Sequence, residues 1–127
     1  MSTARILVVE DNPKNMKLVR DVLEFSGYEV IEATTGEDGV RLAGSEHPHL
    51  ILMDLQLPGI DGTEALRRLR ALPQTQDVPI VAVTAFAMQA DRERAFENGF
   101  DGFVEKPISV RGLLEQVRRF LAGEGST

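Results

Sequence analysis

The chain has 127 residues, of which 43% are hydrophobic and 27% are charged, and its formal net charge is −6. This length predicts one domain with a real hydrophobic core, and the composition is that of an ordinary globular protein. The acidic balance argues against direct nucleic-acid binding, and the absence of cysteine excludes disulfides, thiolate nucleophiles and zinc–thiolate sites.

Short apolar runs alternate along the chain with amphipathic segments. The first run is continuous, short and rich in β-branched residues, as expected of a strand that is covered on both faces. In chain order the runs predict strands at Arg5–Val9, Tyr28–Ala33, Leu50–Met53, Pro79–Ala85 and Gly102–Glu105.

Helices are predicted between and after these strands. Asn12-Pro13 supplies an N-cap and a proline at the first helical position, and Gly27 ends this first helix. The later helices are expected to begin at Thr35, Asp61, Met88 and Ser109. The apolar positions predicted to face inward are Leu18, Val19, Val22, Leu23 and Phe25 in the first helix, Leu66 and Leu69 in the third, and Val110, Leu113, Leu114, Val117, Phe120 and Leu121 in the fifth.

This alternation of five strands and five helices predicts an α/β domain. Its sheet is expected to be parallel and doubly wound, with helices on both faces and the strand order 2-1-3-4-5. We assign residues 1–123 to this domain and residues 124–127 to a flexible C-terminal tail.

Polar side chains follow four of the predicted strands. Glu10 and Asp11 follow the first strand, Asp54 the third, Thr84 closes the fourth, and Lys106 follows the fifth. In doubly wound sheets ligands bind outside the carboxyl ends of the strands, near the switch in strand order. Taken singly, most of these residues have an ordinary structural explanation as a cap, a strand residue or a loop residue. Asp54 is the exception, because the Leu-Gln-Leu-Pro that follows gives it no helix to cap. Their shared position at strand ends favours one pocket.

The predicted pocket holds more negative than positive charge. Two like charges about 4 Å apart repel by roughly 4 kcal/mol at an effective dielectric constant near 20, so one lysine cannot offset three acids. Either a carboxyl group stays protonated or a cation binds. A partly open site made of oxygen ligands suits Mg²⁺, which usually keeps several waters.

Four stretches of the sequence together resemble the motifs of bacterial response-regulator receiver domains from two-component systems. These stretches are ILVVEDN (6–12), LILMDLQLPGIDG (50–62), VTA (83–85) and EKP (105–107), and the resemblance extends over nearly the whole chain. It implies a flavodoxin-like (βα)5 fold and a stand-alone receiver. Such a protein is a phosphorylation-dependent switch or phosphorelay carrier. It is not a conventional enzyme, although it catalyses its own phosphorylation and dephosphorylation on aspartate.

The resemblance also implies a role for each matching acidic residue. Asp54 is the expected phosphoacceptor, taking the phosphoryl group from a phosphohistidine. Mg²⁺ is expected to bind directly to Asp11, to Asp54 and to the backbone carbonyl of Gln56. Glu10 is expected to act on the metal through water.

The remaining motif residues are expected to bind or sense the phosphoryl group. Lys106 would pair with Asp54 or with a phosphoryl oxygen, and Thr84 would hydrogen-bond to that oxygen. Phe103 matches the switch aromatic of the family and would turn inward as Thr84 moves, although a phenylalanine here is equally explained as core. The peptide bond between Lys106 and Pro107 is expected to be cis, as it is in the family.

The partners implied by the resemblance are proteins. The phosphoryl donor would be a sensor histidine kinase or a histidine phosphotransfer protein. A downstream target would bind the surface of the fourth helix, fifth strand and fifth helix. We expect a cytoplasmic protein, monomeric or dimerising on phosphorylation, that contacts neither nucleic acid nor membrane.

Two other functions compete with this one. IDGT (60–63) resembles the nucleophile motif of small Mg²⁺-dependent phosphatases of the haloacid-dehalogenase type. That motif follows a strand that ends in an aspartate two places earlier, whereas Leu57-Pro58-Gly59-Ile60 precedes Asp61 here. A flavodoxin-type binder of a phosphate-bearing cofactor would need a phosphate loop after the first strand. The acidic segment EDNPKN (10–15) would instead repel phosphate.

Overall fold

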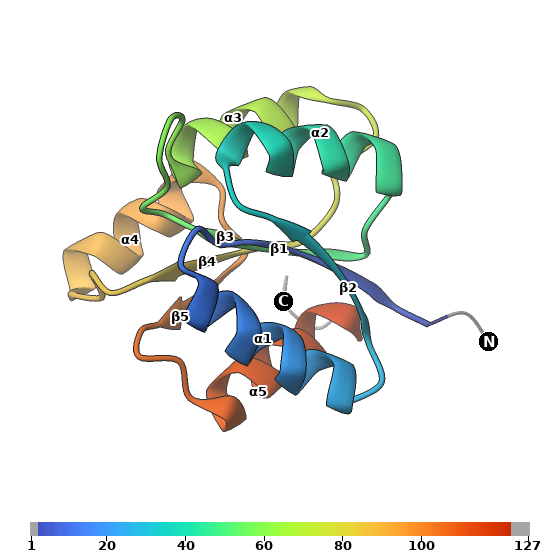
Figure 1. The fold of residues 1–127 in the computed structure, drawn as a ribbon. Coiled ribbons are helices and arrows are strands. Elements are labelled where there is room, and N and C mark those ends of the chain that lie inside the picture. Colours follow the sequence, from blue (N-terminus) through green and yellow to red (C-terminus); the bar gives the residue numbers. More distant parts are fainter. Residues whose placement is uncertain (1–2, 123–127) are drawn as a thin grey trace.

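A computed structural model of the chain describes residues 3–122, in which strands and helices alternate as the sequence predicts (Figure 1). The predicted tail, residues 124–127, lies outside the described residues. The strands are β1 (Arg5–Val9), β2 (Glu29–Ala33), β3 (Leu50–Asp54), β4 (Ile80–Thr84) and β5 (Gly102–Glu105). The helices are α1 (Pro13–Phe25), α2 (Gly36–Glu46), α3 (Gly62–Ala71), α4 (Gln89–Asn98) and α5 (Val110–Leu121).

The strands form a parallel sheet in the order β2-β1-β3-β4-β5, which confirms the predicted topology. The register pairs Ile6 of β1 with Val30 on one side and with Leu50 on the other. Helices α1 and α5 cover one face of the sheet, and α2, α3 and α4 cover the other (Figure 1). None of the helices in residues 3–122 has the length and apolar character that crossing a membrane requires.

The hydrophobic core has two halves, one on each face of the sheet. Successive strand residues point to opposite faces, so Leu7 and Val9 pack toward α2 and α3 while Ile6 and Val8 pack toward α1 and α5. All five residues of β3 are buried. Because both faces are covered, the central strands read as unbroken apolar runs rather than as alternating ones.

The predicted helix starts are confirmed. Side chains of Asn12, Thr35, Asp61 and Ser109 each accept a backbone N–H of the first helical turn that follows them. The start of α4 is different, because Met88 offers no such oxygen. Its backbone N–H instead donates to the Asp91 carboxylate at 3.2 Å.

The predicted inner face of α1 is wrong at two positions. Phe25 is 95% exposed and Leu18 is 38% exposed, whereas Met16, Val19 and Leu23 are buried. The buried residues are three and four positions apart and so share one face of the helix. Phe25 lies two positions after Leu23, which turns it about 200° away from that face.

The inner face of α5 is confirmed for Leu113, Val117 and Phe120, which are buried, but Val110 at its first position is 49% exposed. Strand ends also shift by a residue. β3 includes Asp54, and β4 begins after Pro79, which has no N–H for the ladder.

One arginine joins three segments at the end of the sheet opposite the carboxyl ends of the strands. The Arg70 guanidinium, at the end of α3, donates to the Asp101 carboxylate at 2.6 Å. It also donates to backbone carbonyls of two loops, those of Gln76, Val78 and Gly99, at 3.1, 2.7 and 3.2 Å. Asp101 in turn accepts the N–H of Ile80 at 2.8 Å. Arg70 therefore fixes the C-terminal end of α4 to α3 and β4.

We expect Arg70→Gln to lower the free energy of unfolding by about 1–3 kcal/mol, because partly buried acceptors lose a charged donor. The midpoint of urea unfolding measures this change. Arg67→Gln is the matched control, since Arg67 pairs with Glu64 from a side chain that is 69% exposed and should cost less than about 1 kcal/mol. Equal losses in the two variants would contradict the role given to Arg70.

Candidate functional site

The alternation of strand side chains brings three charged residues to one side of the sheet. Glu10 follows Val9 of β1, Asp54 ends β3, and Lys106 follows Glu105 of β5. All three continue the positions that point toward α1 and α5, since Val8, Leu52 and Val104 belong to that half of the core. The carboxyl ends of parallel strands meet at one edge of the sheet, so these side chains converge there.

Asp54 lies at the centre of this group and is 2% exposed. One carboxylate oxygen, Oδ2, accepts a hydrogen bond from Lys106 Nζ at 2.9 Å. The other, Oδ1, accepts the backbone N–H of Gln56 at 2.9 Å. The buried carboxylate therefore has a charged partner and a neutral donor. These two hydrogen bonds offset the free-energy cost of burying an acid at the end of a strand.

Lys106 also joins Asp54 to Glu10. Its Nζ lies 3.1 Å from Glu10 Oε1, and the Glu10 side chain is 4% exposed. Glu10 Oε2 accepts the backbone N–H of Asn12 at 3.0 Å, at the start of α1. The three side chains thus form a small ionic network across β1, β3 and β5.

The pKa values of the two flanking groups are shifted upward. Burial raises the pKa of Glu10, the Asn12 N–H opposes this effect, and the nearby Asp54 carboxylate adds to it. Burial alone would lower the pKa of Lys106, but hydrogen bonds and charges from Asp54 and Glu10 outweigh burial, and its pKa lies above the ordinary value. The ammonium is therefore held charged, and it is shared between two acids.

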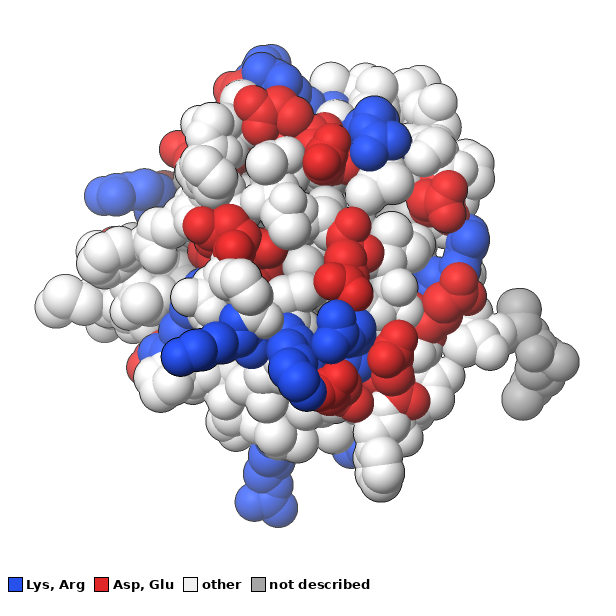
Figure 2. All heavy atoms as spheres, in the orientation of Figure 1, with Lys and Arg blue, Asp and Glu red and all other residues white. Residues whose placement is uncertain are grey.

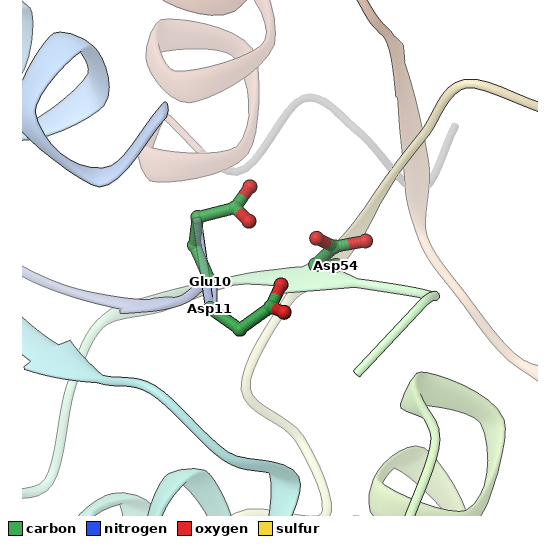
Figure 3. Close-up of side chains that lie close together, drawn as sticks. All are labelled: Glu10, Asp11 and Asp54. Atoms are coloured by element: carbon green, nitrogen blue, oxygen red, sulfur yellow. The ribbon is translucent and has the colours of Figure 1, made fainter. Parts of the chain in front are cut away.

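Asp11 completes an acidic cluster with Glu10 and Asp54. Each of these residues offers one carboxylate oxygen, and these three oxygens lie within 4.8 Å of one another. Figure 3 shows the three side chains directed toward a common space at the edge of the sheet. Asp11 is exposed, whereas the other two are buried, so the cluster opens to solvent on one side.

The donor set fits a hard divalent cation. Three carboxylates face one ammonium, which leaves an excess of negative charge in a partly buried space. Carboxylate oxygens at an open edge are the ligands that Mg²⁺ takes while keeping part of its water shell. On the face drawn in Figure 2, acidic side chains lie above and beside a short row of basic ones.

Thr84 is fully buried at the end of β4, but its side chain belongs to the opposite side of the sheet from Asp54. Its hydroxyl oxygen accepts the backbone N–H of Phe86 at 3.0 Å and lies 3.5 Å from Gln56 Nε2. Among the described residues, the hydrogen-bond partners of this hydroxyl are therefore Phe86 and Gln56 rather than the carboxylates. The Gln56 side chain was not singled out by the sequence analysis.

Phe103 lies on the side of the sheet covered by α4. The residue is 9% exposed and belongs to the same half of the core as Ala82 and Ala95. The Arg92 guanidinium of α4 lies over the ring, 5.0 Å from its centroid. In this structure the ring is thus already covered, which agrees with the core position that the sequence left open beside an inward turn on phosphorylation.

The loop between β3 and α3 is held close to Asp54 by glycine. A Cβ atom placed on Gly62 would lie 2.6 Å from the Asp54 carbonyl oxygen, and Gly59 has a φ of +75°. Both positions therefore need glycine for a physical reason.

Asp61 caps α3 by accepting the Glu64 N–H at 2.9 Å. Asp61 thus has a structural role and does not lie at a strand end, which removes the support for the phosphatase alternative.

The peptide bond between Lys106 and Pro107 is cis, which is the isomer expected from the sequence. The Lys106 N–H donates to the Thr84 carbonyl at 2.8 Å, which continues the β4–β5 pairing up to the site.

Comparison with known proteins places this geometry in a family. The sequence model of the response regulator receiver domain family matches residues 6–118 of this chain. A curated relative, the polar-differentiation response regulator DivK of Brucella ovis, is 44% identical over 119 residues, which are 94% of this chain and 97% of DivK.

Solved structures are similar over the same length. The receiver domain of the sensor histidine kinase PA1611 from Pseudomonas aeruginosa is 36% identical with a TM-score of 0.88, covering 95% of this chain and 99% of that one. That domain holds a magnesium ion in its active-site cleft. A CheY-like receiver domain protein from Methanospirillum hungatei is 32% identical with a TM-score of 0.87, and 97% of each chain is covered.

We expect Asp11→Asn to stabilise the metal-free protein slightly and to weaken its stabilisation by Mg²⁺. Removing one of three clustered charges relieves up to about 1 kcal/mol of repulsion at this exposed position. In the unaltered protein, Mg²⁺ at a hundredfold excess over its dissociation constant should add about 2.7 kcal/mol. Thermal unfolding with and without Mg²⁺ measures both effects. Asp77→Asn, an exposed acid in the loop before β4, is the control, and an equal Mg²⁺ response in the two variants would contradict the metal site.

Proposed function

This chain belongs to the response regulator receiver domain family, and from that premise we propose that it is a phosphorylation-dependent switch or phosphorelay carrier with Asp54 as its phosphoacceptor. The observation that supports this most strongly is the meeting of Asp54 and Lys106 at 2.9 Å beside Glu10 and Asp11. A buried carboxylate paired with an ammonium, in a cluster open to solvent on one side, is placed to act as a nucleophile.

Asp54 attacks the phosphorus of a phosphohistidine on a donor protein. A bond forms between a carboxylate oxygen and phosphorus, and the bond from phosphorus to the imidazole nitrogen breaks. The leaving nitrogen keeps the electron pair, and the product on this chain is an acyl phosphate. The Gln56 N–H on Asp54 Oδ1 orients the carboxylate for this attack.

Asp11 and Asp54 would hold Mg²⁺, together with the Gln56 carbonyl, and Glu10 would act at the metal through water. A metal ion bound there would neutralise the charge that develops on the phosphoryl oxygens. Lys106 already lies against Asp54 Oδ2 and needs little movement to reach an oxygen attached to that carboxylate. The raised pKa of Lys106 keeps its ammonium charged for this contact.

Phosphorylation then changes the surface of α4, β5 and α5. Thr84 turns its hydroxyl to a phosphoryl oxygen and gives up its contact with the Phe86 N–H, which lies 3.0 Å away in this structure. Moving a two-state equilibrium from 1:99 to 99:1 takes about 5.5 kcal/mol, whereas one charge-assisted hydrogen bond contributes about 1.5–3 kcal/mol. Lys106, the metal and a bound partner must therefore supply the rest.

The partners are proteins of two kinds. The donor is a sensor histidine kinase or a histidine phosphotransfer protein, and the downstream target binds the surface of α4, β5 and α5. That surface carries exposed apolar side chains near its edge, including Met88 at 77% and Phe96 at 49% exposure. Exposed apolar groups of this size are typical of protein-binding surfaces.

We expect Asp54→Asn to abolish labelling of the chain by acetyl phosphate, because an amide oxygen is a much weaker nucleophile than a carboxylate. Labelling is measured with radioactive phosphodonor on the intact protein. Asp77→Asn serves as the matched control and should label normally. Chelation of Mg²⁺ should also stop the labelling of the unaltered protein. Undiminished labelling of the Asp54→Asn variant would overturn the assignment of the phosphoacceptor.

We expect Lys106→Ala to retain some labelling but to lose most of the conformational response. The response is measured as the amide chemical-shift change in α4, β5 and α5 on adding beryllofluoride, a phosphoryl mimic. Lys17→Ala, an exposed lysine in α1, is the control and should respond fully. A full response in the Lys106→Ala variant would refute a switching role for this ammonium.

A further inference from the structure

Arg92 of α4 makes two contacts with β5. Its guanidinium lies over the ring of Phe103, 5.0 Å from the centroid, and one guanidinium nitrogen lies 3.6 Å from Glu105 Oε1. A guanidinium within about 6 Å of a ring centroid is attracted by the electron-rich face of the ring. The two contacts place one side chain across the gap between the helix and the edge strand.

The strand geometry explains why one arginine reaches both residues. Phe103 and Glu105 are two positions apart in β5, so their side chains leave the sheet on the same face, the face that α4 covers. Glu105 pairs with Thr84 in the sheet and directly precedes Lys106. Arg92 thus contacts a residue, Glu105, that neighbours both Thr84 and Lys106, the two residues that we propose for phosphoryl binding.

The burial of Phe103 depends on few groups. Phe103 belongs to the core, and the residue as a whole is 9% exposed. Within α4, all of whose residues are described, Ala95 alone is buried. The helix therefore covers this part of the sheet with little apolar surface of its own. The aliphatic stem and the guanidinium of Arg92 supply part of the cover that α4 otherwise lacks.

We propose that Arg92 is a positioning residue that holds Phe103 in its buried position before phosphorylation and so ties α4 to β5. The functional effect of this contact rests on the proposed function, because Phe103 and α4 belong to the surface that a partner would bind. It makes the buried ring a resting feature of this chain rather than a product of phosphorylation. Phosphorylation would then act on a surface in which Arg92 already holds Phe103 and α4 in place.

The expected size of the effect is modest. An exposed cation–π contact corresponds to a shift of about two- to fivefold in a two-state equilibrium. Arg92 is half exposed, at 51% of its side chain, so this range is appropriate. The ion pair with Glu105 adds little, since both side chains are about half exposed.

The test measures the exposure of Phe103 directly in the unphosphorylated protein. Fluorophenylalanine replaces the 6 phenylalanines of the chain, and Phe103→Leu identifies the fluorine signal of that ring. The difference in this signal between H₂O and D₂O reports how far the ring is exposed. Arg92→Gln should raise the exposed population about two- to fivefold. Arg92→Lys, which keeps the charge, should fall between Arg92→Gln and the unaltered protein.

Arg94→Gln is the matched control. Arg94 lies on the same helix and is exposed, but it faces a cleft toward α3 that Asn98 and Phe100 also line. It should leave the Phe103 signal unchanged. Urea unfolding is followed for all variants, because a purely structural role for Arg92 would lower the midpoint without changing the Phe103 signal. If Arg92→Gln does not fold, the Phe103 signal is measured in Glu105→Gln instead. The exposed population of Phe103 should rise there too, by a smaller factor.

The outcomes separate this inference from the proposed function. An unchanged Phe103 signal in Arg92→Gln, with normal labelling of Asp54 by acetyl phosphate, overturns the role of Arg92 and leaves the proposed function intact. A shifted Phe103 signal in a protein that acetyl phosphate does not label supports the contact and overturns the proposed function. A shift in Arg94→Gln as large as that in Arg92→Gln also overturns the inference.

Discussion

The contact between Lys106 and the buried carboxylates of Asp54 and Glu10 is the interaction on which the site depends. Nζ lies 2.9 Å from one acid and 3.1 Å from the other, and neither acid is more than a few per cent exposed. Charges in such a position are costly unless they are paired. One ammonium cannot balance both of them and Asp11 as well, so the site keeps an excess of negative charge. That remaining charge is the physical reason for proposing a divalent cation here.

The fold positions this contact by simple rules. Parallel strands bring their carboxyl ends to one edge, and the two-residue period directs Glu10, Asp54 and Lys106 to the same face. The same period directs Thr84 and Phe103 to the opposite face, under α4. The acidic cluster and the two residues proposed to respond to phosphorylation thus lie on opposite sides of one sheet. Residues 105 and 106, adjacent in β5 and its continuation, connect the two sides.

The sequence predicts the architecture well, because covered parallel strands and capped helices leave strong local patterns. The strand order, the helix caps and the convergence of Glu10, Asp11, Asp54 and Lys106 all agree with the structure. Two of the wrong positions, Phe25 and Val110, lie at helix ends, where periodicity alone does not show where burial stops. The third, Leu18, lies inside α1 one position before the buried Val19 and so falls beside the buried face. Arg92 could not be found in this way, since its contacts depend on how α4 sits over β5.

A crystal structure of the chain grown with Mg²⁺ and beryllofluoride tests the central claim most directly. The account predicts a metal ion bound by the carboxylates of Asp11 and Asp54, a beryllofluoride group on Asp54, and Lys106 in contact with one of its fluorine atoms. A metal ion bound elsewhere, or an Asp54 carboxylate free of beryllofluoride while another residue carries it, would contradict the account.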